Sequence, residues 1–126
     1  MRIPSLTALT LACLAMGTGL AAAACDGSTG RGWASGKGTG SYEMTGSGPC
    51  LIPFVGFFSN GGQDFTEATE VSLRKAPKSG TVGLTRRGIT YTPNAGFKGR
   101  DEFCTINRSS AVPGETLGGC YTITVR

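Results

Sequence analysis

Residues 88–103 read Gly-Ile-Thr-Tyr-Thr-Pro-Asn-Ala-Gly-Phe-Lys-Gly-Arg-Asp-Glu-Phe, and this stretch decides the fold. Residues 89–92 are rich in β-branched and aromatic side chains, which is typical of a strand. Pro93 ends that strand because proline has no backbone N–H to donate to a neighbouring strand. Gly96 and Gly99 suit a backbone that turns with positive φ angles. The pattern therefore predicts a short strand, a turn and the start of a second strand.

Further short strands are expected on both sides of this stretch. Residues 81–85 precede the strand at 89–92, and two arginines and a glycine between them give a hairpin signal. Residues 101–107 and 120–126 also read as strands, consecutive and antiparallel. Gly/Pro turns separate the strands, and no helical pattern is found after residue 24. Such a chain is expected to form an all-β sandwich or barrel.

The opening stretch also carries the motif Tyr-x-Pro-x-x-Gly-Phe-x-Gly-x-Asp-x-Phe, and residues 77–82 before it read Pro-x-x-Gly-x-Val. Together, residues 76–106 resemble the bacterial Ig-like and cadherin-like domains of exported proteins. The resemblance implies an immunoglobulin-like β-sandwich with no catalytic residues. The motif positions in this chain are Tyr91, Pro93, Gly96, Phe97, Gly99, Asp101 and Phe103.

The motif side chains have structural roles in this interpretation. Tyr91 and Phe103 would bury large rings between the two sheets, and Phe97 would close its loop onto the core. Asp101 would accept backbone N–H bonds within the turn. The rival role for Asp101 is calcium binding, as in true cadherins, but Asp101 and Glu102 supply too few carboxylates for that.

The cysteines predict a disulfide framework. Of the five cysteines, Cys13 lies in the expected export signal, which leaves four in the mature chain. Four cysteines allow three connectivities. Cys104 and Cys120 would lie on the outer face of two neighbouring strands, which favours a cross-strand Cys104–Cys120 bridge and leaves Cys25–Cys50. No C-x-x-C pair is present, so a zinc site of the usual local form is not expected.

Residues 1–24 read as a secretory signal peptide, with one early arginine, an uncharged apolar run and small residues before Cys25. An uncleaved membrane anchor is one alternative. Lipid attachment at Cys25 is another, although it would leave an odd thiol. The predicted location is therefore secreted or periplasmic, where disulfides persist.

Residues 25–49 are rich in glycine and predict a flexible arm. Trp33 and Tyr42 are its only large side chains, and they either fold back onto the domain or form an aromatic ligand site. The predicted Ig-like domain then covers residues 50–126.

The chain of 126 residues has no histidine, a net charge of +4 and 16% charged residues. Without histidine, Ser-His-Asp and Cys-His catalysis are excluded, and no cofactor, metal or nucleic-acid partner is expected. The basic residues either form a patch for a polyanion or protect an exposed strand edge. They cluster in the sequence at Arg74, Lys75, Lys78, Arg86 and Arg87.

These observations predict a small exported, non-enzymatic Ig-like module that binds a protein or a glycan at the cell envelope or outside the cell. Residues 57–66 and 107–119 would form the contact loops, because a rigid sandwich holds its loops in place. The alternative is a structural envelope component that self-associates through an open strand edge and the apolar residues 51–58.

Overall fold

The computed structural model describes residues 24–126, so the predicted signal peptide lies outside the described residues except for Ala24. The described chain is almost entirely strand and contains one short 3₁₀ helix. In chain order the elements are β1 (Ala24–Thr29), η3 (Trp33–Ser35), β2 (Gly38–Thr45), β3 (Cys50–Ile52), β4 (Gly56–Ser59), β5 (Asp64–Glu67), β6 (Glu70–Lys75), β7 (Gly80–Thr85), β8 (Gly88–Pro93), β9 (Gly99–Arg108) and β10 (Leu117–Val125).

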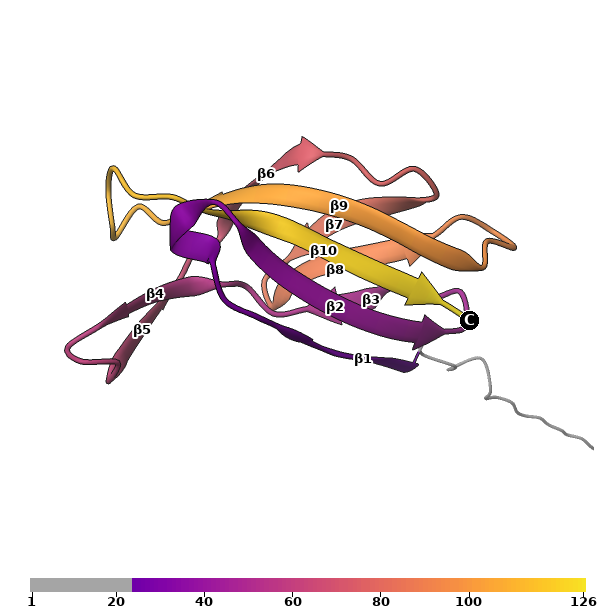
Figure 1. The fold of residues 1–126 in the computed structure, drawn as a ribbon, viewed down its shortest axis with the longest axis horizontal. Coiled ribbons are helices and arrows are strands. Elements are labelled where there is room, and N and C mark those ends of the chain that lie inside the picture. Colours follow the sequence, from indigo (N-terminus) through magenta and orange to yellow (C-terminus); the bar gives the residue numbers. More distant parts are fainter. Residues whose placement is uncertain (1–23) are drawn as a thin grey trace, which may run out of the picture.

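The strands form two packed sheets and a separate hairpin (Figure 1). The larger sheet has the order β1-β2-β10-β9-β6, and the smaller sheet has the order β3-β8-β7. Strands β4 and β5 pair only with each other and project from one end of the molecule. All neighbours are antiparallel except β2 and β10, which are parallel. The fold is therefore an all-β sandwich, as the sequence predicts.

Residues 88–103 cross from one sheet to the other. Strand β8 belongs to the smaller sheet, and β9, which follows it, belongs to the larger one. In the connection, Gly96 and Gly99 have φ angles of 80° and 131°, which glycine adopts without the strain of a side chain. Strand β8 ends at Pro93, and β7 and β8 form the hairpin expected around Arg86 and Arg87.

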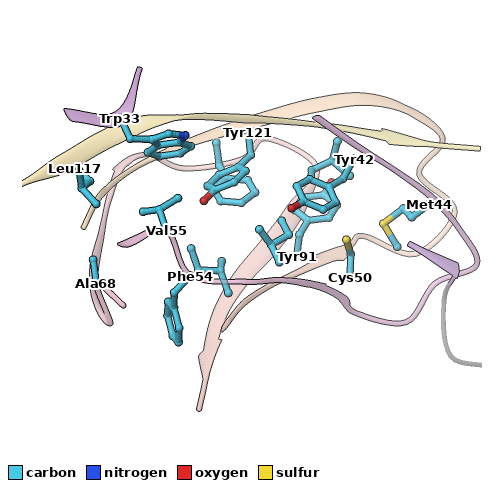
Figure 2. Packing of buried hydrophobic residues seen from close by; sticks show 14 of the residues in the cluster. Trp33, Tyr42, Met44, Cys50, Phe54, Val55, Ala68, Tyr91, Leu117 and Tyr121 are labelled. Atoms are coloured by element: carbon cyan, nitrogen blue, oxygen red, sulfur yellow. The ribbon is translucent and has the colours of Figure 1, made fainter. Parts of the chain in front are cut away.

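Aromatic rings fill the space between the sheets. Tyr91, Phe103 and Tyr121 are completely buried, and they come from β8, β9 and β10. The Phe103 ring stacks on Tyr91 with centroids 6.2 Å apart and on Tyr121 with centroids 5.0 Å apart. Figure 2 shows the core extending from Trp33 and Leu117 at one end to Met44 at the other.

The prediction of a flexible arm at residues 25–49 is wrong, because β1 and β2 are integral strands of the larger sheet. The glycines of β2 permit close packing. A Cβ atom on Gly38 would lie 2.2 Å from the Trp33 ring, and one on Gly40 would lie 2.6 Å from Tyr121. Trp33 and Tyr42 are buried, which confirms that they fold back onto the domain. The domain therefore begins at β1 and not at residue 50.

Both expected disulfides are present. Cys104–Cys120 joins the paired strands β9 and β10. Cys25–Cys50 joins β1, the edge of the larger sheet, to β3, the edge of the smaller sheet. No helix among residues 24–126 is long and apolar enough to cross a membrane.

Replacing both Cys25 and Cys50 with alanine should lower the free energy of unfolding by about 3 kcal/mol, because this bridge closes a long loop of the unfolded chain. Urea denaturation of the double variant, followed by Trp33 fluorescence, measures the loss. A loss much smaller than this would show that hydrogen bonds to β2 hold β1 in place without the bridge.

Candidate functional site

The motif carboxylate of Asp101 joins elements that are distant in the sequence. Asp101 is only 6% exposed. Its Oδ1 accepts the backbone N–H of Lys78 at 3.0 Å and that of Glu102 at 2.9 Å. Its Oδ2 accepts the backbone N–H of Ser79 at 2.9 Å and the hydroxyl of Tyr91 at 2.8 Å. Two of the donors thus come from the connection between β6 and β7, not only from the turn in which Asp101 was expected to act.

The hydrogen bonds keep Asp101 ionised. Burial by itself raises the pKa of Asp101, but the bonds from Lys78, Ser79, Tyr91 and Glu102 favour the charged form, and the pKa lies below its ordinary value. Burial and the same carboxylate raise the pKa of Tyr91, so this hydroxyl stays a donor. Both carboxylate oxygens are used within the protein, which fits a structural role for Asp101.

Two of the five clustered basic residues line a hollow that also contains acidic side chains. Lys75 and Lys78 line a polar hollow of about 360 Å³ together with Arg100, Asp101, Glu102 and Thr122. In this hollow Lys75 is paired with Glu102 at 2.6 Å. Arg74 does not line this hollow, and its guanidinium lies 3.7 Å from the sulfur of Cys120. The mixed charges of the hollow weaken the polyanion interpretation.

A concave, mainly apolar groove of about 650 Å³ lies between the projecting hairpin and the end of the core. Four parts of the chain line this groove. They are the end of β1 through η3 together with one residue of β2, the connection between β3 and β4, the β4–β5 hairpin, and the residues around the start of β10. Its lining residues are Thr29, Gly30, Arg31, Gly32, Trp33, Ala34, Tyr42, Pro53, Phe54, Val55, Gly56, Phe57, Phe58, Phe65, Glu115 and Leu117.

The hairpin presents an aromatic pair to solvent. Phe58 is 70% exposed and Phe65 is 48% exposed, and they lie opposite each other on β4 and β5 with ring centroids 4.9 Å apart. Phe65 lies across Gly56, where a Cβ atom would approach its ring to 2.6 Å. A tight turn closes the hairpin, with Asn60 and Gly61 at φ angles of 54° and 66°. The turn and Gly56 therefore fix where the two phenylalanine rings lie on the surface.

The floor of the groove is the end of the core. Trp33 packs on Tyr121 with ring centroids 5.1 Å apart, and the Tyr42 hydroxyl lies 3.0 Å from the Thr29 hydroxyl. Arg31 and Glu115 are the only charged residues that line the groove. The surface therefore suits apolar groups, with one charge of each sign available nearby.

The sequence anticipated part of this groove. Residues 57–66 contribute three of its phenylalanines, and residues 107–119 contribute Glu115 and Leu117. The second loop is shorter than expected, because β9 runs to Arg108 and β10 begins at Leu117. The sequence did not indicate that Phe54 and Val55 line the groove, because an apolar residue is as typical of a buried core position as of a binding surface.

No group of three His, Cys, Asp or Glu side chains lies close enough within residues 24–126 to hold a metal ion. A scan against models of known protein families found no match to this chain, and a search of curated proteins found none either. Residues 24–126 form a disulfide-bonded β-sandwich with an aromatic-lined surface groove.

Asp101→Asn should lower the free energy of unfolding by about 2–3 kcal/mol near neutral pH, because a charged acceptor of four hydrogen bonds is lost. The folded-state pKa of Asp101 is lowered. Its contribution is therefore present above the unfolded-state pKa of about 3.9 and is lost as the pH falls through the folded-state pKa. Urea denaturation should show the difference from wild type shrinking between about pH 5 and pH 2.

The matched control is Asp26→Asn, which changes an exposed aspartate on β1. It should leave the free energy of unfolding almost unchanged. A difference between wild type and Asp101→Asn that stays constant down to the lowest pH would contradict the ionised-acceptor role.

Proposed function

We propose that this chain is a small exported, non-enzymatic Ig-like binding module that uses its aromatic-lined groove to hold apolar side chains of a protein partner. It acts in the periplasm or outside the cell. Two observations support the exported location: the leader-like residues 1–24, and two disulfides, which indicate an oxidising compartment. The Ig-like assignment rests on the sequence motif together with the β-sandwich.

The observation that carries the binding proposal is the convergence of distant segments on one groove. Residues 57–66 and 107–119 were expected as contact loops from the sequence alone, and both line the groove beside Trp33. Binding sites of sandwich proteins are commonly assembled from such loops on a rigid scaffold. The groove volume of about 650 Å³ lies within the usual range for ligand pockets.

The lining favours a protein over a glycan. Phe58 and Phe65 offer large exposed rings without hydrogen-bonding groups, whereas sugar hydroxyls require many polar partners. Arg31 and Glu115 are the only charged residues among the lining residues. Exposed aromatic residues beside a pocket are typical anchors of protein–protein contacts. An aromatic or aliphatic side chain of the partner therefore fits this groove best.

Peptides selected from a random displayed library on the wild-type domain should contain aromatic or aliphatic anchors and should bind in the groove. Trp33 is the single tryptophan of the chain, so its fluorescence reports on this site directly. Phe58→Ser should weaken the selected synthetic peptides by about tenfold or more, since truncating an aromatic anchor costs more than about 1 kcal/mol.

The matched control for this experiment is Leu51→Ser, which changes a 37% exposed leucine on β3 that does not line the groove. Its affinity should equal that of wild type. The proposal fails if the selected peptides bind Phe58→Ser as tightly as wild type. It also fails if an oligosaccharide array gives the only Phe58-dependent binding.

Self-association is a second candidate, and the exposed hairpin favours it. Most of the apolar segment 51–58 is not available for this, because Ile52, Phe54 and Val55 are buried and Phe57 packs against the core. Phe58 is 70% exposed, compared with 37% for Leu51, the other exposed large apolar side chain of the segment. If the hairpin mediates assembly, sedimentation should show a mass that rises with concentration and Phe58→Glu should abolish the rise. A monomer at high concentration would exclude it.

A further inference from the structure

The two packed sheets have four edge strands, and three of them are protected. Strand β1 carries the exposed charge of Asp26 and is joined to β3 at Cys25. Strand β3 is only three residues long and is followed by Pro53. Strand β6 contains a bulge between Leu73 and Lys75 and carries charged side chains. Short length, bulges, proline and charge are the usual devices that prevent an edge strand from pairing.

Strand β7 has none of these devices. Its six residues, Gly-Thr-Val-Gly-Leu-Thr, include no charge and no proline. Its pairing with β8 runs without a register shift from Gly80 to Thr85. Within residues 24–126 no strand pairs with its other edge. Backbone N–H and C=O groups on that edge therefore remain available to another strand.

The sandwich is also open beside this edge. Leu84 lies opposite the fully buried Ile89, so it faces the interior, yet it is 54% exposed. Leu73 on β6 lies opposite the fully buried Thr105 and is 46% exposed. Inward-facing leucines are normally covered by the opposite sheet. Here the smaller sheet has only three strands and the larger sheet has five, so part of the larger sheet has no strand opposite it. One more strand beside β7 would extend the smaller sheet toward β6 and cover both leucines.

We propose that the free edge of β7 accepts an extended strand from a partner protein, with apolar side chains at alternate positions and acidic residues at both ends. Main-chain hydrogen bonds to β7 supply the affinity, and the apolar side chains cover Leu73 and Leu84. The acidic ends meet cations that flank β7 on both sides: Lys78 before it, and Arg86 and Arg87 after it.

The same cations disfavour pairing with a second copy of this chain. An antiparallel β7–β7 pair would set Lys78 of each copy beside Arg86 and Arg87 of the other. A parallel pair would set identical cations side by side. Like charges opposite one another destabilise a strand pair. None of these β7 and flanking residues lines the aromatic groove, so this surface and the groove are separate.

The test uses the folded domain and a fluorescein-labelled synthetic peptide, Glu-Asp-Val-Thr-Val-Thr-Val-Asp-Glu. A second peptide replaces its acidic residues with lysine. Saturable binding of the acidic peptide is expected, and the lysine peptide should bind at least about tenfold more weakly. Hydrogen exchange should slow at the alternate amides of residues 80–85 that point away from β8, because these become paired with the peptide. Leu84→Lys should weaken the acidic peptide about tenfold or more.

Two further variants make the result specific. Leu51→Lys places the same charge on the partly exposed outer face of β3 and should leave binding unchanged. The double variant Arg86→Glu with Arg87→Glu should reverse the preference, so that the lysine peptide binds more tightly than the acidic one. These variants change exposed side chains, and urea denaturation checks that each remains folded.

The proposal is overturned if the acidic peptide shows no saturable binding up to about 1 mM. It is overturned equally if Leu51→Lys and Leu84→Lys weaken binding alike, or if exchange slows at β6 and not at β7. Dimerisation without peptide that Leu84→Lys abolishes would assign the edge to a second copy of the chain and would also overturn it.

Discussion

The buried carboxylate of Asp101 is the interaction on which the arrangement of the two sheets depends. It lies on β9 of the larger sheet and accepts a hydrogen bond from the hydroxyl of Tyr91 in the smaller sheet. It also accepts the backbone N–H groups of Lys78 and Ser79, which lie in the connection from β6 to β7 that joins the two sheets. Four donors stabilise the ionised group enough to offset the cost of burying it. The Tyr91 ring that this carboxylate anchors is also the first member of the stack with Phe103 and Tyr121, so polar and apolar contacts fix the same spacing.

The groove is a continuation of this core and not a separate addition. Tyr121 at the end of the stack packs on Trp33, and Trp33 lines the groove. The positions of the groove walls are therefore set by the same packing that stabilises the fold. The hairpin behaves differently, because its two strands pair only with each other and its aromatic pair is open to solvent. A well-packed floor beside a less supported wall suits the proposed binding of an apolar side chain.

Local sequence patterns predicted the strands of the second half of the chain and the Cys104–Cys120 bridge, because turn residues and cross-strand cysteines act over short distances. The Cys25–Cys50 bridge then followed as the remaining pair. The same patterns misjudged the first half. A glycine that permits flexibility and a glycine that makes room for a ring look identical in the sequence, and Gly38 and Gly40 are of the second kind. The groove could be predicted only as two loops, since its assembly requires knowing that β10 lies beside β2. The open edge of β7 depends in the same way on the unequal number of strands in the two sheets.

The parallel pairing of β2 with β10 has a consequence for the order of folding. Strand β2 lies near the start of the described chain and β10 at its end, so the larger sheet joins the two most distant parts of the chain. Such non-local contacts carry a large entropic cost before they give any stabilisation, which makes folding slow. The larger sheet cannot be completed until the last ten residues or so have emerged. In the proposed export with the first residues leading, the larger sheet can therefore be completed only after β10 has been released.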